Sequence, residues 1–258
     1  MSVGDRLGFA KELAQGAGEL TLSYFQRADL EVETKADESP VSAADKAAET
    51  WIRERLAERF PDDGILGEEH GEVAGRSGYR WVIDPIDGTH SFVQGLPFYA
   101  NLISVEEGVS PVAGVIHFPA MAETLWGTRE KVQWQTGTKV ATARVSSVGR
   151  LDRALFVTTS PNYFIESGCP EIYERLVGAT RLTRGLPDAY SLAAVITGRA
   201  EVCVEPTLRR WDISAAEALV IGAGGRYTDM QGGGSYRSSI VSNGRVHDQI
   251  LTITKGEA

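Results

Sequence analysis

The stretch WVIDPIDGTHSF at residues 81–92 joins an apolar run to two carboxylates and a tight turn. The run from Tyr79 to Ile83 predicts a buried strand. Asp84 follows where the apolar run stops, and Pro85 cannot donate a backbone hydrogen bond. We therefore expect the strand to end at Asp84.

The residues after this strand suit the binding of a cation and a phosphate. Asp87 lies three residues beyond Asp84, at a turn closed by Gly88. Two carboxylates held by such a turn can coordinate one or two hard cations, and Mg²⁺ prefers oxygen ligands of this kind. Thr89–Ser91 predict a short helix whose free N–H groups could bind a phosphate. An ordinary Pro-x-Asp-Gly turn explains the same residues without any function.

Three further acidic residues carry weaker signals, and each also has a purely structural explanation. Glu68 lies in the glycine-bounded sequence GEEHG, where adjacent glutamates are commonly solvated. Asp212 opens an apolar helix, where the helix dipole favours a carboxylate. Asp45 falls in the first turn of a helix that Ser42 is expected to cap, so Asp45 either caps this helix or points into a site.

The distribution of apolar residues predicts an α/β protein of stacked sheets and helices, as a single unit over residues 1–258. A soft boundary is expected near 145–152, where VSSVGRLD interrupts the pattern. Strands first form a meander and then alternate with helices. Helices are expected at 5–26, 42–60, near 171–178, 188–198, 212–222 and from about 246, and strands at 79–84, 101–106, 112–118, 123–127, 132–135, 155–158, 200–205, 225–229 and 239–242.

Composition narrows the classes of function. The formal net charge of −9 argues against nucleic acid as the main partner, since binding its phosphate backbone needs a basic surface. No stretch approaches the roughly 20 apolar residues that span a bilayer, and the charged N-terminus lacks a signal-peptide core. Cys169 and Cys203 are too few for a disulfide framework or a cysteine-based zinc site. We therefore expect a cytoplasmic protein without a membrane or nucleic-acid partner.

Taken together, the motifs resemble those of the inositol monophosphatase superfamily. They are K-x-D-x-S-P-V-x-x-A-D at 35–45, G-E-E at 67–69, W-V-I-D-P-I-D-G-T at 81–89, and W-D at 211–212 before an alanine-rich helix and a Gly-Gly pair. Such short motifs seldom occur together in this order by chance. The resemblance covers about residues 5–250. It implies an αβαβα sandwich of the inositol monophosphatase and fructose-1,6-bisphosphatase type, generally dimeric, with two to three Mg²⁺ ions.

The resemblance also implies roles for single residues. Thr89 together with Glu68 would orient the attacking water, and Asp45 would position Thr89. The backbone amides of Gly88 and Thr89 would hold the phosphate. The implied reaction is hydrolysis of a small phosphate monoester, in which clustered Mg²⁺ screens the anionic phosphate and activates the water. The implied metal ligands are Glu68, Asp84, the Ile86 carbonyl, Asp87 and Asp212.

Two segments bear on the choice of substrate. Ser91 before Phe92 resembles the branch that hydrolyses L-histidinol phosphate, although that branch usually has Lys or Arg where this chain has His90. The sequence GLPDAY at 185–190 resembles the G-D-x-Y segment of the same branch, with Pro187 in place of Gly. Inositol phosphatases carry different residues in both segments.

Two acids extend this interpretation. Asp188 offers a carboxylate to a cationic amine, and it is equally explained as the N-cap of the next helix. Glu205 ends a strand where the family contacts the part of the substrate remote from the phosphate. We therefore predict an L-histidinol-phosphate phosphatase that serves histidine synthesis. An inositol-1-phosphate phosphatase with the same metals is the main alternative. A nucleotide bisphosphatase ranks lower, because that branch has Glu-Phe where this chain has Ser91 and Phe92.

Other classes of function fit the sequence less well. A non-catalytic metal- or phosphate-binding regulator is disfavoured because every expected site position holds a competent residue. A dinucleotide-binding oxidoreductase is excluded because no G-x-G-x-x-G follows a strand. His90 is expected near the site or on the surface rather than on a metal, since the neighbouring ligands are all oxygen. Arg209 and Arg210 are expected to form a solvated pair.

Overall fold

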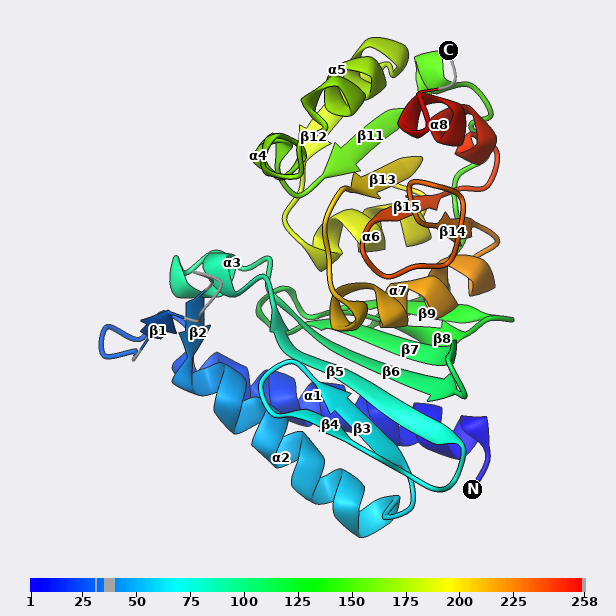
Figure 1. The fold of residues 1–258 in the computed structure, drawn as a ribbon. Coiled ribbons are helices and arrows are strands. Elements are labelled where there is room, and N and C mark those ends of the chain that lie inside the picture. Colours follow the sequence, from blue (N-terminus) through cyan, green and yellow to red (C-terminus); the bar gives the residue numbers. More distant parts are fainter. Residues whose placement is uncertain (31, 35–39, 257–258) are drawn as a thin grey trace.

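The computed structural model describes residues 1–30, 32–34 and 40–256. These residues form five layers in the order helix, sheet, helix, sheet, helix (Figure 1). The predicted αβαβα sandwich is confirmed. Residues 35–39 of the 35–45 motif lie outside the described residues. In the described part of the chain, no helix combines the length and the apolar character needed to cross a membrane.

The larger sheet is largely a meander, because each strand from β5 to β10 pairs antiparallel with the next one in sequence. One pair in this sheet is parallel: β3 lies parallel to β5, and Gly67 lies opposite Ile83. In spatial order the described strands are β10 (Lys139–Thr142), β9 (Val132–Thr136), β8 (Glu123–Thr128), β7 (Ser110–Phe118), β6 (Ala100–Glu107), β5 (Tyr79–Asp87), β3 (Gly64–Gly67) and β4 (Gly71–Val73).

Two long helices, α1 (Val3–Tyr24) and α2 (Ala43–Arg59), cover the outer face of this sheet. Leu13, Ile52 and Leu56 from these helices are buried against strand residues that include Trp81. The predicted start of α2 is confirmed: Ser42 accepts a hydrogen bond from the backbone of Ala44, and the Asp45 carboxylate accepts one from the backbone N–H of Ser42. A short hairpin of β1 (Val32–Thr34) and β2 (Pro40–Ser42) precedes α2.

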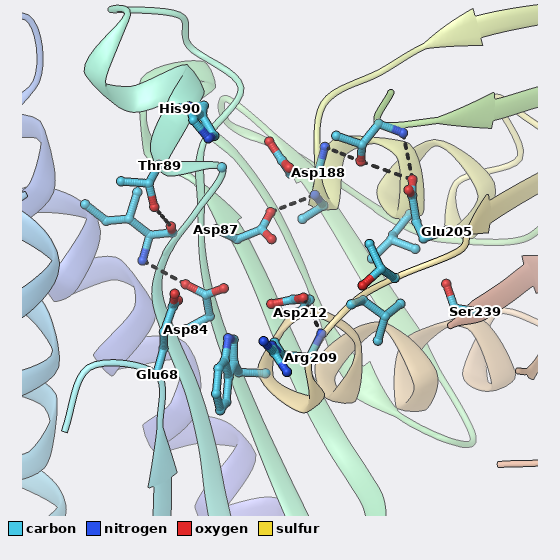
Figure 2. Close-up of a pocket in the computed structure, with 18 of the residues that line it drawn as sticks. Glu68, Asp84, Asp87, Thr89, His90, Asp188, Glu205, Arg209, Asp212 and Ser239 are labelled. Atoms are coloured by element: carbon cyan, nitrogen blue, oxygen red, sulfur yellow. Dashed lines mark hydrogen bonds between the residues drawn. The ribbon is translucent and has the colours of Figure 1, made fainter. Parts of the chain in front are cut away.

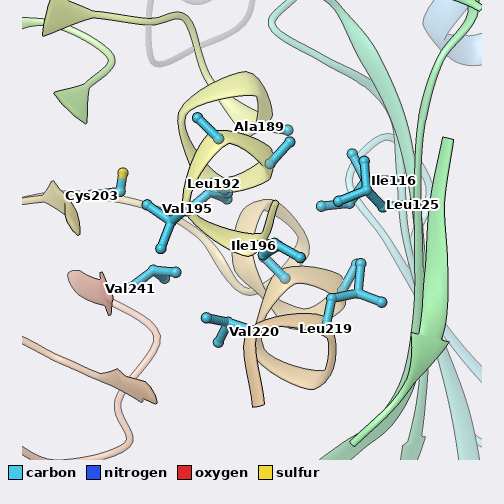
Figure 3. Packing of buried hydrophobic residues seen from close by; sticks show 14 of the residues in the cluster. Ile116, Leu125, Ala189, Leu192, Val195, Ile196, Cys203, Leu219, Val220 and Val241 are labelled. Carbon is cyan, nitrogen blue, oxygen red and sulfur yellow. The ribbon is translucent and has the colours of Figure 1, made fainter. Parts of the chain in front are cut away.

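The central layer consists of α6 (Ala189–Ile196) and α7 (Arg210–Gly222), which lie between the two sheets. Their apolar faces meet Ile116 and Leu125 of the larger sheet on one side and Cys203 and Val241 of the smaller sheet on the other (Figure 3). Gly114 on β7 permits this packing, since a Cβ atom there would lie 2.5 Å from the carbonyl oxygen of Ala215 on α7. The central layer therefore fixes α7 against the larger sheet.

The smaller sheet has β11 parallel to both β12 and β13, while β15 runs antiparallel to its neighbours. Phe156 and Ile240 on this sheet pack against Phe164 and Leu176 in the outer helices. The strands in spatial order are β12 (Leu182–Gly185), β11 (Leu155–Thr158), β13 (Val202–Glu205), β15 (Ser239–Ser242) and β14 (Arg226–Thr228), and the outer helices are α4 (Pro161–Glu166), α5 (Pro170–Ala179) and α8 (His247–Thr254).

Two single-turn 3₁₀ helices, η1 (Pro119–Met121) and η2 (Leu151–Arg153), lie in connections. Residues 143–150 join the two sheets without a helix or strand, and the boundary expected near 145–152 overlaps this connection. The predicted helices and strands are all present; β11 and β15 have the expected bounds, and the ends of the others are shifted. The short elements β1 to β4, β10, β12 and α4 were not predicted.

The strand predicted to begin at Tyr79 was expected to end at Asp84. This expectation is wrong, because β5 continues through Pro85 to Asp87. Asp84 lies opposite Leu102 and Asp87 lies opposite Ala100, so three steps on β5 match two on β6. Pro85 therefore falls in a β-bulge, where its missing N–H removes no regular pairing.

Candidate active site

A pocket of about 440 Å³ opens where the end of β5 faces the first turns of α6 and α7 (Figure 2). The bulge at Pro85 turns this end of β5, so both of its carboxylates face the pocket. The backbone N–H of Ile86 donates to Asp84 at 3.1 Å and holds that carboxylate in place. Among the described residues, six carboxylates line the pocket: Glu68, Asp84, Asp87, Asp188, Glu205 and Asp212.

Three of these acids lie close enough together to share a cation. One oxygen from each of Asp84, Asp87 and Asp212 falls within 4.8 Å of the others. Glu68, which follows β3, contacts Asp84 and lines the same end of the pocket. Asp212 is held in the first turn of α7, where its carboxylate accepts the backbone N–H of Arg209 at 2.6 Å. The structure thus brings together all four carboxylates that the sequence suggested for metal binding.

The electrostatics of this cluster favour a bound cation. Burial raises the pKa of Asp84 well above its usual range, and the charges of Glu68 and Asp87 add to the effect. Burial and the Asp188 charge likewise raise the pKa of Asp87. Burial raises the pKa of Asp212 to about 7. Since the donors are all oxygen and their negative charges repel one another, this set of residues fits a hard cation such as Mg²⁺.

Glu68, Asp84, Asp87 and Asp212 are called the metal-type cluster below. Thr89 begins the short helix α3 (Thr89–Val93) and lies beside this cluster. Its hydroxyl is 3.1 Å from the carbonyl oxygen of Ile86 and 3.4 Å from the Asp45 carboxylate. Asp45 is fully buried and does not line the pocket, so it contacts Thr89 from behind. The capping explanation for Asp45 is confirmed for one carboxylate oxygen, and the other oxygen faces Thr89 without lining the pocket.

The other end of the pocket is built around Glu205 at the end of β13. The Glu205 carboxylate accepts the backbone N–H of Thr159 at 2.7 Å and the Thr159 hydroxyl at 3.0 Å. The same hydroxyl accepts the backbone N–H of Asp188 at 3.0 Å. Burial raises the pKa of Glu205 to about 7. Thr159 thus links Glu205 to Asp188, whose carboxylate lies beside Gly88.

Asp188 occupies the N-cap position of α6, but its side chain makes no capping hydrogen bond. The capping explanation for its carboxylate is therefore wrong, and the side chain lines the pocket instead. Its backbone has a φ of 49°, an uncommon conformation for a residue other than glycine. Burial raises the pKa of Asp188 to about 6, while His90 acts in the opposite direction. Figure 2 shows His90 at the same rim of the pocket.

The structure also shows pocket residues that sequence reasoning missed. Thr159 and Tyr163 follow the end of β11, and the ends of parallel strands commonly form ligand sites, so a signal for them was available. Ser239 lines the pocket from β15 and carries no local sequence signal. The expectation of a solvated arginine pair is wrong for Arg210, which donates to the buried carboxylate of Glu106 at 2.7 Å, whereas Arg209 is exposed and lines the pocket.

Comparison with known proteins agrees with this geometry. A histidinol-phosphatase of Chlorobaculum parvum is 39% identical over 91% of this chain and 88% of its own length. A histidinol-phosphatase of Streptomyces coelicolor is 39% identical over 96% of both chains. The solved structure of an IMPase of Thermotoga maritima superimposes with a TM-score of 0.84 at 31% identity, covering 98% of this chain and 97% of that one. The sequence model of the inositol monophosphatase family matches residues 5–256, and the chain belongs to that family.

Proposed function

We propose that this protein is a Mg²⁺-dependent phosphomonoesterase that hydrolyses L-histidinol phosphate to L-histidinol and phosphate. The observation that carries the proposal is a single pocket that holds a metal-type carboxylate cluster together with two further acids, Asp188 beside Gly88 and Glu205 at the end of β13. Histidinol phosphate has a phosphate at one end and an ammonium and an imidazole at the other, so its charges match those of the pocket. The similarity to proteins named histidinol-phosphatase supports the same substrate.

In this proposal, Glu68, Asp84, Asp87, Asp212 and the Ile86 carbonyl hold two to three Mg²⁺ ions. When bound, Mg²⁺ supplies positive charge that neutralises the phosphate oxygens and the departing alkoxide and makes a water more acidic. No nucleophilic side chain is required, because in-line attack by water on phosphorus needs mainly positioning and charge stabilisation.

The residues of the chain position the water and the phosphate. The Thr89 hydroxyl has one proton, which it gives either to Ile86 or to Asp45, and its lone pairs remain available to accept from a water. Glu68 provides the second acceptor for that water, and Asp45 keeps Thr89 in place. The backbone N–H groups of Gly88 and Thr89 point at the phosphate from the start of α3.

Asp188 and Glu205 select the part of the substrate that carries no phosphate. The Asp188 carboxylate pairs with the substrate ammonium, and Glu205 accepts a hydrogen bond from the remote ring. Inositol offers only hydroxyl groups to these acids and gains less from them. We extend the proposal to a cytoplasmic homodimer, as expected from the family resemblance; the free thiols of Cys169 and Cys203 suit a reducing compartment.

The test is Mg²⁺-dependent phosphate release from L-histidinol phosphate and from inositol 1-phosphate, each with and without a chelator. The expected result is a much larger kcat/KM for L-histidinol phosphate and no release after chelation. Much faster turnover of inositol 1-phosphate would establish the alternative substrate, and undiminished turnover after chelation would refute the metal site. Light scattering during gel filtration tests the dimer.

A further inference from the structure

Ser239 lines the pocket, and its hydroxyl is buried. The residue has no exposed surface, and its Oγ has no hydrogen-bond partner among the described residues. A buried hydroxyl without a partner costs free energy, and native proteins retain few of them. Because Ser239 lines the pocket, a ligand bound there can supply the partner that its hydroxyl lacks.

The pairing of β13 with β15 in the smaller sheet places the Ser239 side chain next to that of Glu205. Ser239 on β15 is the direct antiparallel partner of Glu205 on β13. Residues directly opposite in an antiparallel pair point to the same face of the sheet, with Cβ atoms about 4.5–5.5 Å apart. Both side chains accordingly lie at the end of the pocket remote from the metal-type cluster (Figure 2).

Glu205 still has capacity to accept a hydrogen bond. Thr159 donates twice to its Oε1, at 2.7 and 3.0 Å. Its Oε2 accepts from Thr158 at 3.3 Å, which is a long bond for a hydroxyl donor. A ligand at this end of the pocket therefore meets a carboxylate oxygen that accepts and, beside it, a hydroxyl that both donates and accepts.

We infer that Ser239 is a substrate-binding residue, whose hydroxyl forms a hydrogen bond with a ring nitrogen of the substrate's imidazole beside the carboxylate of Glu205. This inference rests on the proposed function. A neutral imidazole has one N–H and one unprotonated nitrogen, so it needs one acceptor and one donor. Glu205 can only accept when ionised, and Ser239 supplies the donor that the carboxylate lacks.

Replacement of Ser239 should change the melting temperature in the opposite direction from replacement of a buried serine whose hydroxyl is hydrogen-bonded. Replacing Ser239 with alanine removes a hydroxyl that has no partner in the free protein, so the melting temperature should stay the same or rise. The matched control is Ser242→Ala on the same strand. The Ser242 hydroxyl lies 2.8 Å from Nδ1 of His247 and accepts the backbone N–H of Gly244 at 3.1 Å, so its loss should lower the melting temperature.

The kinetic experiment compares wild type, Ser239→Ala and Ser242→Ala with two substrates. L-Histidinol phosphate has the ring, and glycerol 2-phosphate has only the phosphate and a short polyol. Ser239→Ala should raise KM for L-histidinol phosphate roughly five- to tenfold, the size expected for one neutral hydrogen bond, and leave KM for glycerol 2-phosphate unchanged. The inhibition constant of L-histidinol, which lacks the phosphate, should rise by a similar factor.

The outcomes separate this inference from the proposed function. If the wild-type enzyme does not hydrolyse L-histidinol phosphate, the proposed function fails and the inference fails with it. If the wild type does hydrolyse it but Ser239→Ala leaves its KM unchanged, only the inference is overturned. Equal changes for both substrates, or a fall in melting temperature like that of Ser242→Ala, also overturn it, since they indicate a structural serine.

Discussion

Glu106, near the C-terminal end of β6, accepts a hydrogen bond from Nε of Arg210 at 2.7 Å. Arg210 is the first residue of α7. The carboxylate is fully buried and also accepts two bonds from Arg80 and one from Ser214. Arg210 and Ser214 lie one turn apart on α7, so Glu106 ties that turn to the larger sheet. The same turn carries Asp212, whereas β5, the neighbour of β6, carries Asp84. Glu106 therefore helps to set the spacing of the metal-type cluster.

Replacing Glu106 with glutamine should weaken both folding and metal binding. The change keeps the volume but leaves two arginines without their buried counter-charge, and breaking a buried ion pair typically costs about 3–5 kcal/mol. Because the first turn of α7 loses its tether, we expect a higher dissociation constant for Mg²⁺ as well. Urea unfolding measures the first effect, and calorimetric titration of Mg²⁺ without substrate measures the second.

Asp63→Asn is the matched control for this variant. Asp63 forms a buried pair with Arg6 between α1 and the start of β3, with both side chains at most 5% exposed, whereas the arginines paired with Glu106 are 20% and 22% exposed. This control should lose stability but keep its affinity for Mg²⁺. Equal affinities in the two variants would show that Glu106 supports the fold without positioning the cluster.

Replacing Asp84 with asparagine should separate stability from activity. Turnover should fall by several orders of magnitude, because the neutral amide is a poor ligand for the cations that the reaction needs. Without metal, however, the variant should be more stable than the wild type by about 1–2 kcal/mol, since one of several mutually repelling buried carboxylates is gone. Added Mg²⁺ should raise the melting temperature of the wild type much more than that of the variant.

The measurement for this variant is thermal unfolding with and without Mg²⁺, alongside phosphate release. Near-wild-type turnover would contradict the assignment of Asp84 as a metal ligand. A metal-free variant that is less stable than the wild type would show that Asp84 has a structural role beyond its charge.

Replacing Asp188 with asparagine should change selectivity between substrates. The variant keeps the side-chain shape but loses the charge opposite the substrate ammonium. A hydrogen bond to a charged group contributes about 1.5–3 kcal/mol, so KM for L-histidinol phosphate should rise by about one to two orders of magnitude. KM for inositol 1-phosphate should change little. Equal effects on both substrates would place Asp188 in the shared metal and phosphate machinery instead.

Much of the fold and most of the candidate site could be predicted from the sequence. Long amphipathic helices such as α1 and α2 and the strands from β5 to β9 have clear periodicity, and Ser42 with Asp45 carries its own capping signal. Strands of three or four residues, such as β3 and β12, are too short to show a period. Their pairing partners lie far away in sequence, so only tertiary structure selects them.

The parts of the site that escaped prediction depend on long-range pairing. Glu68 was expected at the site from the family resemblance alone, because it reaches Asp84 through the parallel pairing of β3 with β5, which no local pattern reveals. Arg210 was expected in solvent because its partner Glu106 lies 104 residues away. Ser239 became a candidate only when its register opposite Glu205 and its missing partner were known. The family resemblance supplied the roles of residues, but not these distances.

Replacing Gly88 with alanine should impair substrate binding because the added methyl group displaces the neighbouring side chain of Asp188. Gly88 has a φ of 82°, where a side chain costs about 1–2 kcal/mol, and a Cβ atom there would lie 2.8 Å from the Asp188 carboxylate. The new methyl group should displace Asp188 and crowd the phosphate. Gly108→Ala is the control: its φ is 62°, but no described residue other than its chain neighbours lies within 4 Å of the added Cβ. Both variants should lose similar stability in urea unfolding, and a rise in KM confined to Gly88→Ala would confirm the contact.

His247 should make part of the folding free energy depend on pH. Its ring lies between the hydroxyls of Thr228 and Ser242 at 2.9 and 2.8 Å, and burial lowers its pKa to about 4, with nearby Arg226 acting in the same direction and Asp248 opposing it. A histidine whose pKa is lower in the folded state stabilises the protein fully above its unfolded pKa of about 6.5. That contribution is lost as the pH falls from about 6.5 to about 4.

The test compares urea unfolding of the wild type and His247→Asn at several pH values between 4 and 7.5. The free-energy difference between the two proteins should be constant above about pH 7 and should shrink by at most about 3 kcal/mol toward pH 4, as the wild type takes up a proton on unfolding. His117, whose pKa burial also lowers to about 4, and the pocket carboxylates titrate in both proteins and cancel in the difference. If the difference in unfolding free energy does not change with pH, the protonation state of His247 does not change when the protein unfolds.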